Sequence, residues 1–418
     1  MRARIAVAVT LILLLSGCAS GDRQGEFASP LGQAGVLTTP AFDPPRGFAA
    51  SGTTLGYFEY GGKYLVVGDS VVLAEAGARS TELENVRITD LAGSDPVLAP
   101  HGLTELETTS IAGAEGRSLA FVGGFRAVPG SGTVPDGEEY VVTAYRLPGG
   151  EVAWEKVIPE WSEGTGEAHR EVVIADADDE TVLLDARTRS SAAGGTRSIT
   201  AMALNARDGS TRWSQPGFAP YAITPDVVVG FRFHNGVRCG SCEGALAGLE
   251  TGTGVKRWER EPVRREQKQS EGYERLGEHI VKVRIVHDRT PFTHFVDAAT
   301  GEDKAKLPGS RDCEYDGRDL IVCGTDSVMT GYDARTFGQR WSFGNDTGGR
   351  EVPELRAASN GVVYAESSNG LMTLDGATGD DLDPDLGELN PRAKLLSVRG
   401  GRALVDDSGF LRSFPAIR

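Results

Sequence analysis

The stretch that decides the fold is AMALNARDGSTRW, residues 201–213. An apolar run ends at Asn205, a short polar segment leads to Gly209, and the stretch closes on Trp213. A short polar side chain such as Asn205 can hydrogen-bond to a turn backbone, and glycine supplies the left-handed conformation of a tight reversal. Tryptophan is a large apolar plate, suited to packing between neighbouring units. The stretch therefore predicts a strand, a tight turn and a return strand that opens on a tryptophan.

The same pattern recurs along the chain. Clear copies are LAGLETGTGVKRW, residues 246–258, and TGYDARTFGQRW, residues 330–341, and weaker copies lie at 145–154, 295–301 and 373–379. Five of the 55 glycines, Gly150, Gly209, Gly254, Gly301 and Gly379, mark these turns. We expect the turn and the position after it to depend on Asn205, Gly209, Trp213, Gly254, Trp258, Asp297, Gly301, Asp333, Trp341, Asp375 and Gly379.

The spacing of the turns predicts the architecture. Turn positions 150, 209, 254, 301, 337 and 379 lie 59, 45, 47, 36 and 42 residues apart. A period of 40–50 residues made of short strands is typical of a β-propeller with one four-stranded sheet per repeat. Position 337 is phenylalanine rather than glycine, and because Gly338 follows it, we expect that turn to shift by one residue.

Division by the period gives the number of blades. Residues 51–418 make eight blades at about 46 residues each, whereas seven would need about 53. We predict an all-β, eight-bladed β-propeller of four-stranded antiparallel blades, with seven blades as the alternative. Residues 71–79 are the expected counterpart of the motif in a degenerate first blade. The last blade ends at residues 409–415 without a return strand, so we expect residues 53–60 to supply its outer strand and close the ring.

The pattern strand-Asp-Ala-x-Thr-Gly-x-x-x-Trp resembles the repeat of PQQ-like β-propellers, over roughly residues 140–415. WD and kelch repeats fit poorly, because neither their paired Gly-His and Trp-Asp nor a periodic double glycine recurs. The resemblance implies a ring of the quinoprotein-dehydrogenase-like superfamily, of the non-catalytic type. The dehydrogenases of that superfamily are longer and carry a disulfide between adjacent cysteines over the cofactor, whereas this chain has no adjacent cysteines. We expect no bound PQQ and lean towards no enzymatic activity.

Two acidic segments raise the question of calcium. Asp381, Asp383 and Asp385 alternate as in a calcium loop, but Leu386 and Arg392 hold its glycine and glutamate positions. Residues 176–180 form a second acidic cluster without loop geometry. We interpret both as solvated turns at blade edges and expect no calcium.

The N-terminus has the features of a targeting segment. Arg2 and Arg4 precede an apolar run over residues 5–15, which is typical of a secretory signal and too short to span a bilayer. Leu-Ser-Gly before Cys18 resembles the bacterial lipoprotein processing box, which implies that Cys18 is lipidated and becomes the mature N-terminus. We therefore predict a signal peptide at 1–17, a lipidated flexible tether at 18–50 and a propeller at 51–418. The alternative is an ordinary signal peptide with an incidental cysteine.

The four remaining cysteines, Cys239, Cys242, Cys313 and Cys323, fit an oxidising compartment. We expect structural disulfides, with local pairings favoured among the three that are possible. Cys313 and Cys323 flank an Asp-Gly turn signal, and Cys239 and Cys242 enclose two residues. A redox CxxC lacks its βαβ context here, and a four-thiolate zinc site would need a second CxxC pair.

Charge and loop pattern limit the function. The net charge of −16, which becomes −18 when residues 1–17 are removed, argues against nucleic acid as a partner. Insertions at 128–137 and 190–196 are either binding loops or tolerated surface insertions. The six histidines show no HExxH or paired metal spacing. We expect an extracytoplasmic lipoprotein, on the outer membrane if the organism has one, that binds a protein of the envelope as a scaffold. The alternative is an enzyme or small-ligand sensor that uses the central channel.

Overall fold

The structure is a computed structural model in which residues 41–418 form one compact unit. It describes residues 47–48, 53–57, 63–67, 69–76, 83–91, 96–99, 102–103, 110–131, 136–159, 170–189, 197–233, 237–238, 243–264, 273–287, 290–344, 351–368, 370–382, 394–399, 402–407 and 410–417. Cys18, Cys239, Cys242, Asp383 and Asp385 lie outside these ranges, as do residues 190–196.

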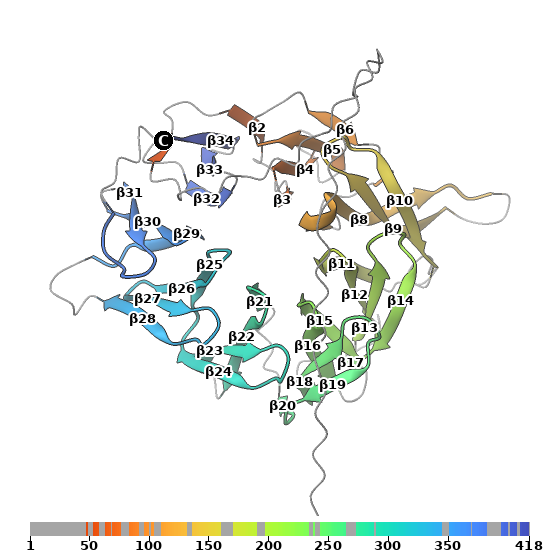
Figure 1. Cartoon of the computed structure of the whole chain (residues 1–418). Helices are drawn as coiled ribbons and strands as arrows, with labels where there is room; N and C mark the ends of the chain where they lie inside the picture. Colours follow the sequence, from red (N-terminus) through yellow and green to blue (C-terminus); the bar gives the residue numbers. More distant parts are fainter. Residues whose placement is uncertain are drawn as a thin grey trace, which may run out of the picture. The chain divides into compact units, whose positions relative to one another are not determined.

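The described strands form eight antiparallel sheets that follow one another around a ring (Figure 1). The first four blades are β3 (Lys63–Val67), β4 (Ser70–Ala76), β5 (Leu83–Asp90) and β6 (Val97–Ala99); β7 (Ser110–Ala114), β8 (Leu119–Val128), β9 (Gly137–Arg146) and β10 (Val152–Ile158); β11 (Arg170–Ala177), β12 (Thr181–Arg189), β13 (Arg197–Asn205) and β14 (Thr211–Pro216); and β15 (Phe218–Ile223), β16 (Val227–Phe233), β18 (Glu243–Glu250) and β19 (Lys256–Glu259).

The remaining blades follow the same order, with the first strand of each blade innermost (Figure 1). They are β21 (Tyr273–Leu276), β22 (Ile280–His287), β23 (Thr290–Asp297) and β24 (Asp303–Pro308); β25 (Asp312–Tyr315), β26 (Leu320–Thr325), β27 (Val328–Asp333) and β28 (Gln339–Gly344); β29 (Glu354–Ser359), β30 (Val362–Ser367) and β31 (Gly370–Asp375); and β32 (Lys394–Arg399), β33 (Arg402–Asp407) and β34 (Phe410–Ile417). The prediction of an eight-bladed β-propeller is confirmed.

The ring closes by strand exchange. β1 (Gly47–Phe48) and β2 (Thr53–Tyr57) both pair antiparallel with β34, so the N-terminal side of the chain supplies the outer strand of the last blade. This confirms the expected role of the segment that begins at Thr53. The assignment of residues 71–79 is wrong: they begin in β4, the second strand of the first blade, whereas the counterpart of the turn follows Asp90, between β5 and β6.

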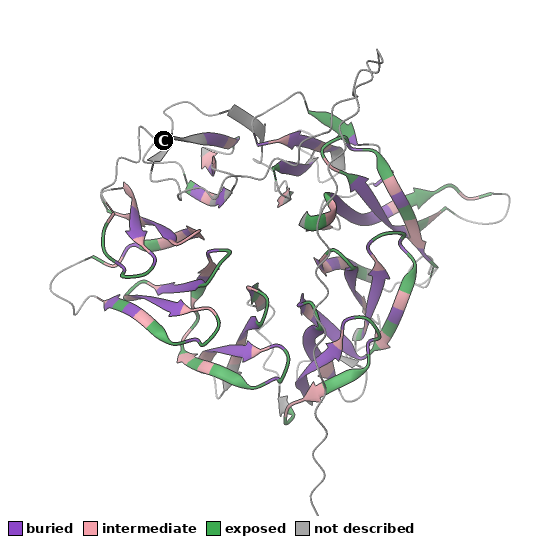
Figure 2. Cartoon of the chain, viewed as in Figure 1, coloured by how far each residue is buried: buried purple, intermediate pink, exposed green. Residues whose placement is uncertain are grey.

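The core lies between blades rather than within them. The blade strands, which have three to ten residues, alternate their side chains between two faces, and each face of a blade meets its neighbour. Among the described residues, nine apolar clusters each join two adjacent blades; two of them lie between the third and fourth blades, and one joins the first and last blades. Burial is densest on the second and third strands, and the outer strands carry most of the exposed residues (Figure 2).

The repeated turn has one local chemistry. The side-chain Oδ1 of Asp297, Asp333 and Asp375 each accepts backbone N–H bonds from the second and third residues that follow it, and Oδ1 of Asn205 accepts one from the second. Arg340 and the Thr336 N–H hold the pKa of Asp333 well below its usual range. The glycine at the end of the turn has a positive φ, as at Gly209, where φ is 71°.

A tryptophan docks each of four such turns onto the preceding blade. The indole N–H of Trp213 donates to the Thr251 carbonyl of the next blade, 2.8 Å away, and a Cβ added at Gly254 would lie 2.8 Å from the ring. Position 254 therefore requires glycine for two reasons: its φ is positive, and the Trp213 ring leaves no room for a Cβ. Equivalent hydrogen bonds run from the indole N–H to a carbonyl of the next blade in three other pairs: Trp154 to Ala206, Trp258 to Ala298 and Trp341 to Gly376.

The turn at position 337 does not shift as predicted. Phe337 itself takes the positive φ, 58°, and its N–H donates to the Asp333 carbonyl, as the glycines do elsewhere. The preceding blade has Ala305 at its tryptophan position, and Phe337 is buried in the cluster against which Ala305 packs. Its ring lies 4.2 Å from that of Phe295 and 4.5 Å from that of Tyr332, measured between centroids. The aromatic side chain therefore comes from the turn instead of from the return strand.

Two glycines of one turn test the docking contact. Gly254→Ala should lower the free energy of unfolding by about 1–3 kcal/mol, because it combines a strained φ with a Cβ too close to the Trp213 ring. Gly252→Ala is the matched control, since a Cβ there meets nothing within 4 Å. Urea unfolding of both variants measures the difference, and equal stabilities would contradict the docking role.

A swap tests the Phe337 arrangement. Phe337→Gly should lower the free energy of unfolding by about 2–4 kcal/mol, because it empties a buried aromatic site. Adding Ala305→Trp should restore stability by recreating the usual pair of tryptophan and glycine. Thermal melting of the single and double variants measures the coupling between positions 305 and 337. If the two substitutions lowered stability additively, Phe337 would not be taking the place of the tryptophan.

Candidate functional site

The two ends of the ring differ in their loops. We call the end that carries the connections between the second and third strands of each blade the hairpin end, and the other end, with the docked turns, the turn end. In the last four blades these connections have two residues each, at 288–289, 326–327, 368–369 and 408–409. In the first four they are longer, at 77–82, 129–136, 190–196 and 234–242. Both insertions identified in the sequence, and the Cys239–Cys242 segment, belong to these long connections of the hairpin end.

Additional short strands link the long connections at their bases. β17 (Val237–Arg238), from the fourth blade, pairs with the start of β13 in the third blade. β20 (Val263–Arg264) pairs with the start of β18. These strands were missed in the sequence, because two-residue bridges carry no periodic pattern.

The β8–β9 hairpin has a charged base. Arg126 donates 2.8 Å hydrogen bonds from Nε to Glu139 and from Nη1 to Glu155, which joins three strands of the second blade. Near the tip, the Gly130 N–H donates to the Asp136 carboxylate at 2.7 Å. Val128, at the end of β8, is 39% exposed. This hairpin therefore presents an apolar side chain on a braced support.

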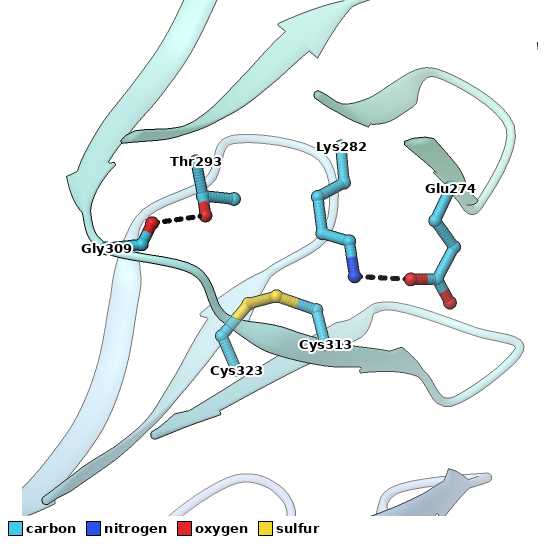
Figure 3. Close-up of a disulfide and its surroundings, with 6 residues drawn as sticks. All are labelled: Glu274, Lys282, Thr293, Gly309, Cys313 and Cys323. Carbon is cyan, nitrogen blue, oxygen red and sulfur yellow. Dashed lines mark hydrogen bonds and ion pairs between the residues drawn. A yellow bond between two sulfur atoms is a disulfide. The ribbon is translucent and has the colours of Figure 1, made fainter. Parts of the chain in front are cut away.

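The structure places a disulfide inside the ring wall. Cys313 and Cys323 face each other across β25 and β26 and form a disulfide, with the Asp316–Gly317 turn between them. Both cysteines are buried, in the cluster between the fifth and sixth blades. Nearby, the buried Lys282 donates to Glu274, and the Thr293 hydroxyl donates to the Gly309 carbonyl at 2.9 Å (Figure 3). These contacts stabilise the wall, and both cysteines of the disulfide are buried in it.

The acidic segment 176–180 is not a set of solvated turn residues. The Asp176 carboxylate accepts a 2.8 Å bond from the Ile223 N–H of the next blade and another from the Ala177 N–H. Burial raises the pKa of Asp176, while Arg275, which donates to the Ile223 carbonyl, opposes the rise. Only Glu180 and Asp179 are exposed. The interpretation of residues 176–180 as a solvated turn is therefore wrong for Asp176, because the next blade covers its carboxylate.

Glu180 joins two blades at the turn end. Its carboxylate accepts hydrogen bonds from Arg117 of the second blade and from Arg207 and Arg212 of the third. The Arg117 and Arg207 contacts hold the pKa of Glu180 below its usual range. The arrangement is a clamp between blades rather than a ligand site, since its charges already face one another.

A second polar link joins the fourth and fifth blades. His294 is buried and its Nδ1 lies 2.9 Å from Asp303 Oδ2, while Arg260 donates to Asp303 Oδ1 at 2.7 Å. Burial opposes ionisation of Asp303, but the bonds to His294 and Arg260 lower its pKa overall. The sequence offered no signal for this link, because its residues come from three separate segments.

No metal site emerges from the described part of the chain. No group of three or more His, Cys, Asp or Glu side chains there could hold an ion. Within the same ranges, no helix has the length and apolar character needed to cross a membrane.

A family model described as outer membrane protein assembly factor BamB matches residues 104–302, slightly less than half of the chain. Residues 104–302 thus carry the PQQ-like repeat that this family model describes. The resemblance seen in the sequence is thereby confirmed. The matched stretch covers the second to fourth blades and three strands of the fifth, which includes three of the four long connections.

One solved structure shows the same fold at low identity. The structure of the Dos1 propeller has a TM-score of 0.51 at 12% identity, covering 89% of this chain and 96% of its own. The crystal structure of a eukaryotic initiation factor has a TM-score of 0.43 at 10% identity, over 80% and 76% of the two chains. The search of curated proteins returned no match.

Removal of the disulfide should weaken the wall between the fifth and sixth blades. For cysteines ten residues apart, the double variant Cys313→Ala/Cys323→Ala should lose about 2–3 kcal/mol of unfolding free energy. Urea unfolding in a Cys239→Ala/Cys242→Ala background isolates this pair. In that background dithiothreitol should lower stability only while Cys313 and Cys323 are present, and an indifferent response would contradict the assignment.

Proposed function

We propose that this chain is a membrane-anchored extracytoplasmic lipoprotein whose propeller binds a protein of the cell envelope as a non-enzymatic scaffold. The observation that carries the proposal is the match of residues 104–302 to the outer membrane protein assembly factor model. A family resemblance alone does not fix function, so the position of the long loops supplies the second argument.

The hairpin end of the first four blades is the proposed binding surface. Loops held by a rigid support are where binding residues concentrate. Here the support is a ring whose walls are filled by apolar clusters and whose opposite end is fixed by docked turns. Loop length therefore varies at the hairpin end without disturbing the core. The four long connections follow from adjacent blades, so they leave the ring at the same end and next to one another in blade order.

The proposed anchor is lipidated Cys18, joined to the ring by the tether. A lipidated N-terminus with more than one acyl chain holds a protein stably on a membrane. Within the proposed tether range, β1 (Gly47–Phe48) pairs with β34 of the last blade. An envelope partner, rather than nucleic acid, also suits the net charge of −16.

A photocrosslinking pair tests the surface. A photoreactive residue replaces Val128 at the hairpin end or, as the control, Val255 at the turn end, two exposed valines at 39% and 61%. In intact cells, Val128 should give a reproducible crosslink to an envelope protein that Val255 does not give. The full chain with Cys18→Ala tests the anchor, since it should lose labelled palmitate and leave the membrane fraction.

Calorimetry provides the opposing test. PQQ and calcium are each titrated into the full chain, and we expect no stoichiometric binding of either. Stoichiometric binding, or equal crosslinks from both valines, would overturn the proposal in favour of a channel-based enzyme or sensor.

A further inference from the structure

Basic side chains of the fifth blade point into its interface with the sixth. Lys282 pairs with Phe295, which belongs to the apolar cluster of that interface, so Lys282 faces the sixth blade. Arg284, two residues further along β22, faces the same way because side chains alternate along a strand. Figure 3 shows Lys282 in the surroundings of the disulfide of the sixth blade.

A second arginine enters the same interface from the sixth blade. Arg311 immediately precedes β25 and stands two residues before Cys313, which belongs to the same apolar cluster. Arg311 is half-buried, Asp312 is exposed and Cys313 is buried, as expected when Arg311 and Cys313 share a face. The chain is fixed just before this point, because the Thr293 hydroxyl donates to the Gly309 carbonyl (Figure 3). Arg311 therefore comes from the wall opposite Arg284.

The alignment of the two blades places these arginines at the same height. At the turn end, a Cβ on Gly277 would lie 3.2 Å from the Tyr315 ring, so Tyr315 aligns with the start of β22 at Ile280. Both strands can be followed from there towards the hairpin end. Four residues along, β22 reaches Arg284 and the chain of β25 reaches Arg311. The two guanidinium groups thus enter the same part of the interface.

The two arginines have donors that the chain does not use. In each side chain Nε is buried, and no described group accepts a hydrogen bond from it. Buried donors are nearly always satisfied, so these two indicate an acceptor from outside the chain. Among the described residues of β21, β22 and the start of β25, one acid faces the same interface: Glu274, which accepts from Lys282. Three positive charges therefore face one negative charge.

We propose that Arg284 and Arg311 together bind a phosphate dianion, either the free ion or a phosphomonoester. Guanidinium groups bind oxyanions through several N–H donors at once, which suits the oxygens of a phosphate. The excess of two positive charges matches a dianion, whereas a carboxylate would compensate one of them. Both side chains are half-buried, so the ligand reaches them from solvent.

This site goes beyond the scaffold function. It lies on blades whose hairpin-end connections have two residues, apart from the long connections of the first four blades. The chain as a whole has a net charge of −16, so a group with excess positive charge is a local exception. Charge of this sign at one interface attracts an anion that the rest of the surface repels.

Calorimetry tests the site. Inorganic phosphate and, separately, glycerol 3-phosphate are titrated into the full chain at about pH 8 and constant ionic strength. We expect saturable binding at one site per chain, and tighter binding of the ester would identify a phosphomonoester as the ligand. Acetate should bind at least tenfold more weakly, because it carries a single charge. Absence of saturable binding by both phosphates, or equal binding of acetate, would overturn the proposal.

Substitutions separate binding from folding. Arg284→Met and Arg311→Met retain an apolar side chain, and each should weaken phosphate binding at least tenfold. Arg318→Met is the matched control, because Arg318 is exposed at the turn end of the same sixth blade, and it should bind as the parent chain does.

Thermal melting gives a second readout of the same variants. Phosphate should raise the melting temperature of the parent chain and of Arg318→Met, because a ligand that binds the folded state stabilises it, but not that of Arg284→Met or Arg311→Met. Without phosphate, neither of these two variants should melt lower than the parent, since each removes an unpaired buried donor. An equal rise in all four proteins would overturn the proposal. Val128 crosslinks judge the scaffold function separately, so either can fail while the other stands.

Discussion

The ring depends on the hydrogen bond from a tryptophan indole to the turn of the next blade. Each blade is a small sheet that buries its two faces only against neighbours, so its stability requires a fixed angle to them. The bond from Trp213 to the Thr251 carbonyl sets that angle through a rigid aromatic plate. The glycine behind it, Gly254, lets the turn approach the ring face. A strand, a turn and an interface are therefore fixed by one contact.

The departures from this contact follow the same logic. Between the fifth and sixth blades the aromatic group is supplied by Phe337 from the turn, and Ala305 leaves room for it. Between the seventh and eighth blades no tryptophan is required, because the outer strand of the eighth comes from the N-terminal side and no such turn precedes it. The sequence accordingly has Asp383 at that position. The lack of a tryptophan at this position of the seventh repeat is thus a consequence of how the ring closes.

Local chemistry made much of the fold predictable from the sequence. Asn205, Gly209 and Trp213 act within a few residues of one another, so a single copy already shows a strand, a turn and a return, and repetition gives the blade number. The strand exchange was predictable because the last blade visibly lacks a return strand. The Cys313–Cys323 pair flanks its own turn, which is again a local signal.

What escaped prediction depends on contacts across blades. From the sequence, Asp176 was interpreted as a solvated turn residue. In the structure, the Ile223 N–H of the next blade donates to its carboxylate. The positive φ of Phe337 is explained only by the neighbouring blade, where Ala305 leaves room for the aromatic ring. The proposed binding surface was visible in the sequence only as insertions, because periodicity shows where connections are long but not that they belong to adjacent blades.

The separation between the two ends of the ring bears on function. At the turn end, tryptophans, glycines, the Glu180 clamp and the Asp176 bridge all join neighbouring blades, so a change there alters the angle between sheets. At the hairpin end, the connections leave the core after their strands have finished packing, and two-residue turns serve as well as long ones. Sequence can change at the hairpin end at little cost in stability. A ring that needs one end for its own assembly has the other available for recognition, and the long connections of the first four blades lie there.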